Sequence, residues 1–228
     1  MNNQSTVQSR SGLADFYSRI YGLVGIGIAI SAVVSYLMLT MFQSTMIDIM
    51  VNHRFLIIGF SIAELALVVF ASSLSMKNSP MALPLFLTYS ALNGFTLSFI
   101  VAQYAQTTVL QAFVTSAILF VVMSVIGRVT KKDLSGMGKA LMAALIGIII
   151  ASVVNIFIGS SGLDFILSIV TVLVFAGLIA WDNQKIEHIY YSVNGQVNNG
   201  WAVSMALSLY LDFINVFISL LRIFGNRD

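Results

Sequence analysis

Three acidic residues stand inside long apolar stretches of this sequence, where an ionised side chain has no water to solvate it. They are Glu64, Asp182 and Asp212, whereas the other acids fall near the ends of such stretches or between them. A charge at the centre of a bilayer costs on the order of 2.5–3.5 kcal/mol, so acids placed there usually mark a functional site. The alternative for each is structural: a protonated or backbone-capping carboxyl group that joins two helices.

Asp182 and Asp212 lie thirty residues apart on two consecutive apolar stretches. The linker at 192–200 is rich in turn-forming Asn and Gly and contains the midpoint between the two acids. An antiparallel helix pair folded there returns both carboxyl groups to the same depth. Two adjacent carboxylates in a dry site do not readily both ionise, so a pair in contact would share a proton and sense pH. Equal depth without contact, with both acids serving packing, is the alternative.

The last apolar stretch carries polar side chains at spacings of 4, 4, 3, 4 and 3, which place them on one face of a helix. These residues are Ser204, Ser208, Asp212, Asn215, Ser219 and Arg222. A polar face that runs from end to end of an otherwise apolar helix indicates a water-accessible path enclosed by other helices. The alternative is a packing stripe of small residues with interhelical hydrogen bonds.

The composition requires a membrane protein. The chain of 228 residues is 58% hydrophobic and only 9% charged, and its mean hydropathy is +0.94. A soluble domain is about one quarter charged. The absence of cysteine excludes disulfides and thiol chemistry, and two histidines are too few for a histidine-built metal site. A net charge of +2 gives no reason to expect nucleic acid as a partner, and nothing indicates a resident cofactor.

Seven apolar segments divide the chain, each close to the ~20 residues that a helix needs to cross a bilayer. They are predicted at 19–42, 55–75, 81–104, 109–130, 138–158, 162–184 and 201–224. The fold class is therefore an all-α polytopic membrane protein with seven transmembrane helices in one domain, residues 19–228. Residues 1–18 are polar and predicted to be a disordered cytoplasmic segment rather than a secretory signal. The short break at 159–162 predicts a tight helical hairpin.

Basic residues predict the orientation of the chain in the cell membrane. Seven spans place eight of them on one side: Arg10, Arg19, Lys77, Arg128, Lys131, Lys132, Lys139 and Lys185. The other side receives three: Arg54, Arg222 and Arg227. Because basic residues concentrate on the cytoplasmic side, the amino terminus is predicted to be cytoplasmic and the carboxyl terminus to lie outside. If the last segment re-enters instead of spanning, the carboxyl terminus returns to the cytoplasm.

Residues 207–217, Leu-Ser-Leu-Tyr-Leu-Asp-Phe-Ile-Asn-Val-Phe, form a long motif in the last apolar segment. This motif closely resembles the last-helix signature of one family, the transmembrane Bax inhibitor motif family. Residues 181–184 are similar to its sixth-helix motif, 131–135 to its fourth-to-fifth helix loop, and 93–97 to its third-helix Gly-x-Thr-Leu element. Glu64 stands where the family carries a buried acid. The resemblance covers nearly the whole chain in the same order.

This resemblance implies a central last helix wrapped by the other six and a pH-sensitive calcium leak with Asp182 and Asp212 as the sensor. In bacterial relatives an arginine eleven residues after the buried acid latches the closed state. Ser75 occupies that position here and the nearest base is Lys77, so the latch residue is replaced and gating is expected to differ. Some bacterial relatives modulate a membrane-anchored protease as a partner.

The leading hypothesis is a calcium leak gated by protonation of Asp182 and Asp212. Calcium prefers six to eight oxygen ligands, and these two carboxylates with Glu64, Asn215, serines and water would form only a weak, transient site. Weak binding suits permeation, because the ion must also leave. The alternative is a non-conducting regulator that binds other membrane proteins.

An enzyme is not expected. The sequence lacks the Gly-x-Gly-Asp element of the aspartyl intramembrane proteases, and no Ser/His pair falls within a membrane segment. The membrane class and the leak hypothesis give the lipid bilayer, calcium and protons as the expected partners, and the regulator alternative adds a membrane protein.

Overall fold

The computed structural model describes residues 2–225, with the side chains of residues 11–53 and 55–225. All regular elements in this range are helices: α1 (Asn2–Thr40), α2 (Gln43–Asn52), α3 (Arg54–Met76), α4 (Ala82–Val101), α5 (Gln106–Val129), α6 (Ser135–Ile158), α7 (Ser161–Ser192) and α8 (Asn199–Gly225). Seven of them, all except α2, are long and apolar enough to span a membrane. The predicted all-α fold with seven spans is confirmed.

The spans differ in how much of each is buried. In the most apolar stretch of α8, 72% of the residues are buried, against 6% in α3 and in α6. Polar side chains that face lipid cost free energy. The burial of α8 shields its polar residues from lipid and avoids that cost. That the other six helices wrap α8 stays a prediction.

The first helix begins earlier than the sequence predicts. Helix α1 starts at Asn2, and its apolar span starts at Ser11. Phe16 and Tyr17 are buried, and the Phe16 ring lies 6.3 Å from the ring of Tyr190. This packing corrects the prediction of a disordered segment for residues 11–18, since aromatic side chains within the polar sequence find a partner on α7. Residues 1 and 226–228 lie outside the described part of the chain.

The short helix α2 was not predicted. It lies between the first two spans, in the interval between the predicted segments at 19–42 and 55–75. Its Met46 is buried in a cluster with Met38 and Phe99, which belong to α1 and α4. Ten residues are too few to cross a bilayer, so the count of seven spans is unaffected.

The chain forms two compact units, and α7 and α8 contribute to both. Unit 1 consists of Met1–Gln103 and Tyr190–Tyr210, and unit 2 of Tyr104–Ile189 and Leu211–Asp228. Unit 1 therefore contains α1 to α4 with the end of α7 and the first part of α8. Unit 2 contains α5, α6, most of α7 and the last part of α8.

In unit 1, α1 packs closely on α4. A Cβ atom on Gly94 would lie 2.5 Å from the Ser31 carbonyl oxygen, so only glycine permits this approach. The Ser31 hydroxyl donates to the Ser90 carbonyl oxygen at 2.7 Å and lies 2.6 Å from the Tyr210 hydroxyl. Tyr210, on α8, is fully buried and donates to Asn93 Oδ1 at 2.9 Å. These bonds join α1, α4 and α8 within unit 1.

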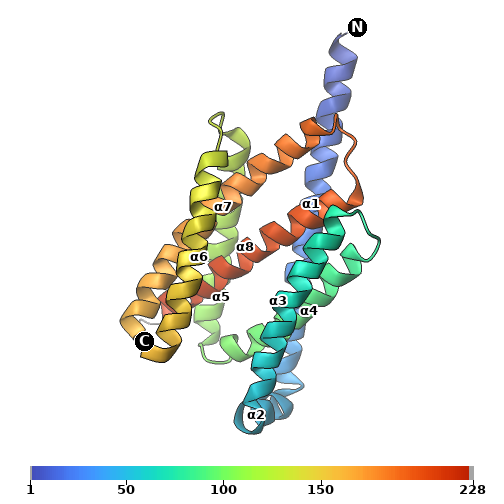
Figure 1. Ribbon diagram of the computed structural model, residues 1–228. Helices are drawn as coiled ribbons and strands as arrows, with labels where there is room; N and C mark the ends of the chain where they lie inside the picture. The colour runs from blue at the N-terminus through green and yellow to red at the C-terminus, as the bar shows by residue number, and fades with distance from the viewer. Residues whose placement is uncertain (1, 226–228) are drawn as a thin grey trace. The chain divides into compact units, whose positions relative to one another are not determined.

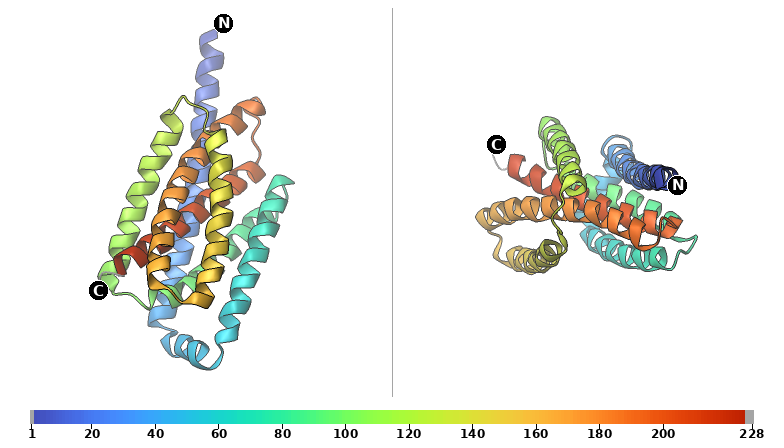
Figure 2. Two further views of the ribbon diagram at one scale, coloured as in Figure 1. Left: turned by 60° about the vertical axis from the view of Figure 1, so that its left-hand side comes forward. Right: turned by 90° about the horizontal axis from the view of Figure 1, so that it is seen from above.

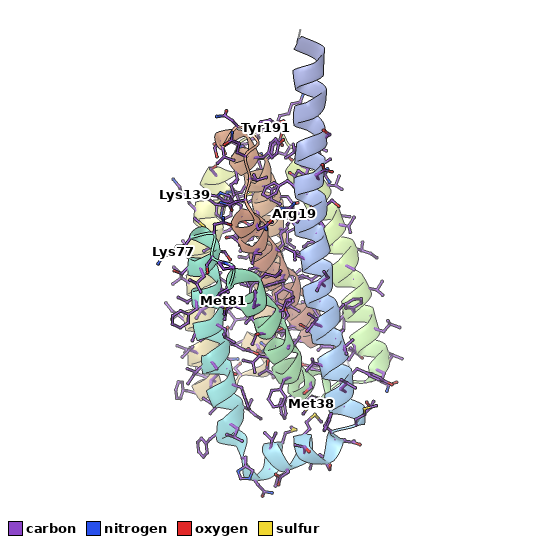
Figure 3. All side chains as sticks on the ribbon, turned by 90° about the vertical axis from the view of Figure 1, so that its right-hand side faces the viewer. Arg19, Met38, Lys77, Met81, Lys139 and Tyr191 are labelled. Carbon is purple, nitrogen blue, oxygen red and sulfur yellow. The ribbon has the colours of Figure 1, made fainter. Side chains whose placement is uncertain are left out.

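Figure 3 shows Arg19 and Lys77 toward one end of unit 1 and Met38 toward the opposite end. This arrangement agrees with counting Arg19 and Lys77 on the same side of the membrane. Among the other basic residues of that count, Arg227 lies outside the described residues, and the side chains of Arg10 and Arg54 are not described. Which side faces the cytoplasm stays a prediction.

In unit 2, glycines bring α5 and α6 against α7. A Cβ atom on Gly127 would collide with the backbone of Ala180, and one on Gly138 would collide with the Trp181 ring. Figures 1 and 2 show α6 and α7 running antiparallel and side by side, joined by a short turn. Gly159 ends α6 in the left-handed conformation at φ +68°, which glycine adopts without strain. The predicted tight hairpin at 159–162 is confirmed.

The faces of α3 and α6 that remain exposed are apolar. On α3 the exposed large apolar side chains recur at spacings of 3, 4, 3 and 4: Phe55, Ile58, Ile62, Leu65 and Val69. On α6 they include Ile146, Ile149, Ile150, Val153 and Phe157. In a membrane protein such faces contact lipid, since they would be insoluble in water.

We predict that Gly94→Ala destabilises unit 1, because its new methyl group meets the backbone of α1, which cannot rotate away. The expected loss is about 1–3 kcal/mol, the usual range for overpacking. The measurement is the thermal unfolding midpoint of the purified protein in detergent.

Gly25→Ala is the matched control, since a Cβ atom at Gly25, also on a membrane helix, meets nothing within 4 Å. Its midpoint should stay at or above that of the wild type. Equal midpoints for the two variants would contradict the close contact of α1 and α4.

Candidate functional site

Asp182 and Asp212 both lie in unit 2, on α7 and α8, and each side chain is buried, with 6% of the residue exposed. The two carboxyl groups are within electrostatic reach of each other. The two acids that the sequence predicts at equal depth thus lie in the same unit, near enough to interact electrostatically. Two carboxyl groups in such a site interact strongly, because little water screens them.

Lys185 is a third charged group at this site, and the sequence reasoning missed it. Its ammonium group is within electrostatic reach of both carboxyl groups and lies 5.2 Å from the centre of the Trp181 ring. From the sequence, Lys185 is identified only as one of the basic residues that predict the orientation of the chain. Its position three residues after Asp182, one helical turn away, is the signal that could have identified it.

One carboxylate oxygen of the pair has no partner. Asp212 Oδ2 is buried and forms no hydrogen bond within the described residues. A buried polar atom without a hydrogen bond costs roughly 1–3 kcal/mol, and nearly all such atoms are satisfied in native proteins. An added proton or a bound cation would remove this cost, so the site suits either.

The residues around Asp182 fix the position of α7. The Asn183 side chain is fully buried and donates to the Ser124 hydroxyl on α5 at 3.1 Å. Trp181 packs on Gly138 of α6, and the backbone of Ala180 packs on Gly127 of α5. Contacts on both sides of Asp182 therefore restrict its rotation and its depth within unit 2.

Gln184 connects the same stretch of α7 to the loop between α5 and α6. Its Oε1 accepts the Leu134 N–H at 2.8 Å, and its Nε2 donates to the carbonyl oxygens of Lys132 at 2.9 Å and Thr130 at 3.2 Å. One side chain thereby satisfies three backbone groups of a loop that has no helix of its own. The loop at 130–134, which carries Lys131 and Lys132, is therefore bound by a residue only two positions after Asp182.

In that loop, Asp133 Oδ1 accepts the Ser135 N–H at 2.9 Å at the start of α6. This hydrogen bond lowers the pKa of the Asp133 carboxyl group, because donors to a carboxylate favour its charged form. Asp133 is therefore ionised at neutral pH and holds the turn that leads into α6. The motifs at 131–135 and 181–184 are therefore in contact, because Gln184 of the second bonds to Lys132 and Leu134 of the first.

The polar stripe of α8 falls in two units. Ser204 and Ser208 belong to unit 1 and are partly exposed; Ser204 lies 3.9 Å from the Met76 sulfur. In unit 2, Asn215 donates to the Leu211 carbonyl oxygen of its own helix at 2.8 Å, and Ser219 is buried. All six residues of the stripe lie on α8, the helix that their spacing requires, and their role in a water-accessible path stays a prediction.

Arg222 forms an ion pair at the end of α8, and its place along a water-accessible path stays a prediction. Its guanidinium donates to Asp164, in the first turn of α7, at 3.1 Å, and about four-tenths of each side chain is exposed. The pair borders a cavity of about 120 Å³ that Tyr104 and Gly225 also line. An exposed ion pair contributes roughly 0–1 kcal/mol, so its main effect is to link the end of α8 to the start of α7.

Glu64 lies on α3 in unit 1 and is half-buried. It accepts a hydrogen bond of 2.5 Å from the Thr96 hydroxyl on α4. Thr96, Gly94 and Asn93 belong to the motif at 93–97. Thr96 contacts Glu64, Gly94 contacts the α1 backbone, and Asn93 contacts both Tyr210 and Glu64. This geometry favours the structural role for Glu64, since its bond joins α3 to α4.

The two candidate latch residues differ in their surroundings, and their role in gating stays a prediction. Ser75 is buried and its hydroxyl donates to the Ala71 carbonyl oxygen of its own helix at 2.7 Å, while Lys77 is exposed at the end of α3. Asn78, just after α3, bonds to the start of α8: its Oδ1 accepts the Gly200 N–H at 3.0 Å. Asn78 has φ +51°, a turn conformation that Asn tolerates and that the neighbouring Ser-Pro pair could have suggested.

The acids do not build a metal cage. No group of three or more His, Cys, Asp and Glu side chains among the described residues is placed to hold a metal ion. Two carboxyl groups alone fall short of the six to eight oxygen ligands that calcium prefers.

Comparison with known proteins gives the family. The model of the family described as "Inhibitor of apoptosis-promoting Bax1" matches residues 13–228. A membrane protein of Streptococcus pyogenes serotype M1 is 59% identical over 221 residues, which cover 97% of this chain and 96% of that protein. The protein YrjE of Lactococcus lactis is 49% identical over the whole of both chains. The inner membrane protein YbhL of Escherichia coli K12 is 38% identical over 99% of this chain and 97% of its own.

The chain therefore belongs to the Bax inhibitor-1 family of membrane proteins. The resemblance of its motifs to this family is confirmed. The seven apolar helices agree with relatives that are named as membrane proteins.

We predict that Gln184→Leu loosens the loop at 130–134 without unfolding α7, because it removes three hydrogen bonds and keeps the volume of the side chain. The loss of roughly 1 kcal/mol for one such bond predicts exchange of the Leu134 amide hydrogen at least about fivefold faster. Hydrogen exchange read by mass spectrometry measures it.

Gln103→Leu is the control, since the Gln103 side chain donates only to a carbonyl oxygen of its own helix, that of Phe99. Exchange at Leu134 should be unchanged in this variant. Unchanged exchange in Gln184→Leu as well would show that Gln184 does not hold the loop.

Proposed function

We propose that this protein is a pH-sensitive calcium leak channel of the cell membrane, gated by protonation of Asp182 and Asp212. The observation that supports the proposal is the buried pair itself: two carboxyl groups within electrostatic reach, one with an unpartnered oxygen. Membership of the Bax inhibitor-1 family agrees with it.

Gating follows from the charge of the pair. At low pH one proton shared between the two carboxyl groups holds α7 and α8 together and the path closed. Raising the pH removes that proton, and the two negative charges then repel each other across a poorly solvated space. Lys185 moderates this repulsion, since its positive charge acts on both groups. Repulsion favours an arrangement in which the carboxylates separate, so the leak increases with pH.

Calcium is the cargo and not a resident cofactor. In the open arrangement two carboxylates, Asn215 and water would give the ion hard oxygen ligands without a tight cage. The polar face of α8 supplies Ser204, Ser208 and Ser219 along the same helix. We assign no catalytic residue, because in this proposal no covalent step takes place.

The orientation belongs to the same proposal. The end of unit 1 that carries Arg19 and Lys77 faces the cytoplasm, because basic residues concentrate there. The loop at 130–134 carries Lys131 and Lys132, so the same rule places it on the cytoplasmic side. Gln184 binds this loop two residues from Asp182, and cytoplasmic pH is therefore the pH that the pair senses.

The non-conducting regulator remains the second candidate. In that role the acids join helices, and the protein acts by binding another membrane protein, such as a membrane-anchored protease. It predicts no calcium flux from the purified protein and co-purification of a partner from membranes.

We predict that calcium influx into liposomes containing the purified wild-type protein rises at least about fivefold from acidic to mildly alkaline pH, the lower end of typical coupling free energies. Asp182→Asn and Asp212→Asn should each lose this pH dependence, because a lone carboxyl group has no partner to share its proton. The measurement is the fluorescence of a trapped calcium indicator across a pH series.

Asp48→Asn is the matched control, since Asp48 is an exposed acid on α2. It should keep the wild-type profile. An unchanged pH dependence in both aspartate variants of the pair would refute the sensor assignment, and an absence of flux at every pH from folded wild-type protein would favour the regulator.

A further inference from the structure

Unit 1 contains a cavity of about 410 Å³ that the proposed leak does not use. It lies between α1, the turn before α4 and the start of α8, at the end of the unit that carries Arg19. Its volume is within the roughly 300–1,000 Å³ of small-molecule sites. The cavity therefore has room for part of a ligand.

One end of this cavity is polar and positively charged. Arg19 lines it, and its guanidinium donates to Asn199 Oδ1 at 2.6 Å. Ser79 and Asn199 are the other polar side chains of the lining, which includes no acid. A guanidinium held by a neutral amide keeps its full charge and free donors, which suits a phosphate oxygen.

The rest of the cavity is apolar. Leu23, Ala82, Leu83, Ala202 and Val203 line it. Ala82 and Leu83 stand at the start of α4, and Ala202 and Val203 at the start of α8, so we expect the cavity near the boundary between hydrocarbon and headgroups. A ligand that fits must be anionic at one end and apolar at the other.

We propose that this cavity binds an anionic phospholipid, with the phosphate at Arg19 and the glycerol and first acyl carbons against the apolar residues. Charge complementarity selects an anionic lipid over a zwitterionic one, since the lining adds a positive charge and no negative one. Basic pockets between spans on the cytoplasmic side are suited to such headgroups.

The cavity also touches the first turn of α8. Gly200 lines it, and the Gly200 N–H bonds to Asn78 on the other side. A Cβ atom at Gly200 would collide with the Ser75 carbonyl oxygen, so α8 begins in close contact with the end of α3. A bound lipid would add its contacts to those that fix the start of α8.

Trp201 provides the measurement, because it lies between two lining residues, Gly200 and Ala202. The chain has two tryptophans, so Trp181→Phe leaves Trp201 as the one tryptophan, which is excited selectively at a wavelength that tyrosine does not absorb. This full-length protein is placed in nanodiscs with a brominated lipid, either phosphatidylglycerol or phosphatidylcholine, at equal mole fractions. We expect brominated phosphatidylglycerol to quench Trp201 at lower mole fraction than brominated phosphatidylcholine.

Arg19→Gln should reduce this preference about fivefold, since one basic residue near the surface contributes about 1 kcal/mol to binding an anionic lipid. Lys77→Gln is the matched control: it removes a cation at the same end of unit 1 that does not line the cavity, and it should keep the preference. Leu83→Phe narrows the cavity and keeps Arg19, so it should weaken quenching by the anionic lipid even if Arg19→Gln fails to fold.

Three results would overturn the proposal. Equal quenching by the two lipids in the parent protein would remove the anionic selectivity. Equal effects of Arg19→Gln and Lys77→Gln, or no effect of Leu83→Phe, would place the lipid outside the cavity. Relief of quenching by millimolar inorganic phosphate alone would identify a site for a soluble anion.

Discussion

A buried pair of carboxyl groups constrains the helices that carry it, because in a membrane neither group can face lipid. Asp182 must therefore lie on the enclosed side of α7, and Asp212 on that of α8. The close packing of α5 and α6 on α7 serves this need. Gly127 and Gly138 remove the side chains that would hold those helices away, and α8 is the most buried of the seven spans.

The two acids of the pair differ in their contacts: the neighbours of Asp182 bind other elements of unit 2, whereas Asp212 has an oxygen without a hydrogen bond among the described residues. Next to Asp182, Trp181, Asn183 and Gln184 each bind a different element of unit 2. Asp212, in contrast, leaves one oxygen without a partner. The energy of a buried carboxyl oxygen without a partner depends on whether a proton or a cation reaches it.

Unit 1 shows how the remaining motif residues hold α8. Tyr210 reaches Ser31 and Asn93 through its hydroxyl, and the start of α8 is held by Asn78 and Arg19. Glu64 takes part in this unit through Thr96 and thus joins α3 to α4. The acids that look alike in the sequence therefore differ: one is satisfied by a neighbouring hydroxyl, and the other two interact as a pair.

The sequence by itself determined the membrane class, the seven spans and the α6–α7 hairpin, because hydropathy and turn residues act locally along the chain. It also placed Asp182 and Asp212 at equal depth, since the linker lies midway between them. Helix rotation decides contact, and rotation depends on packing between distant residues. Only the tertiary structure could therefore bring the pair together, add Lys185, and pair Arg222 with Asp164. It also made Phe16 and Tyr17 part of a helix, because their burial depends on packing against residues far along the chain.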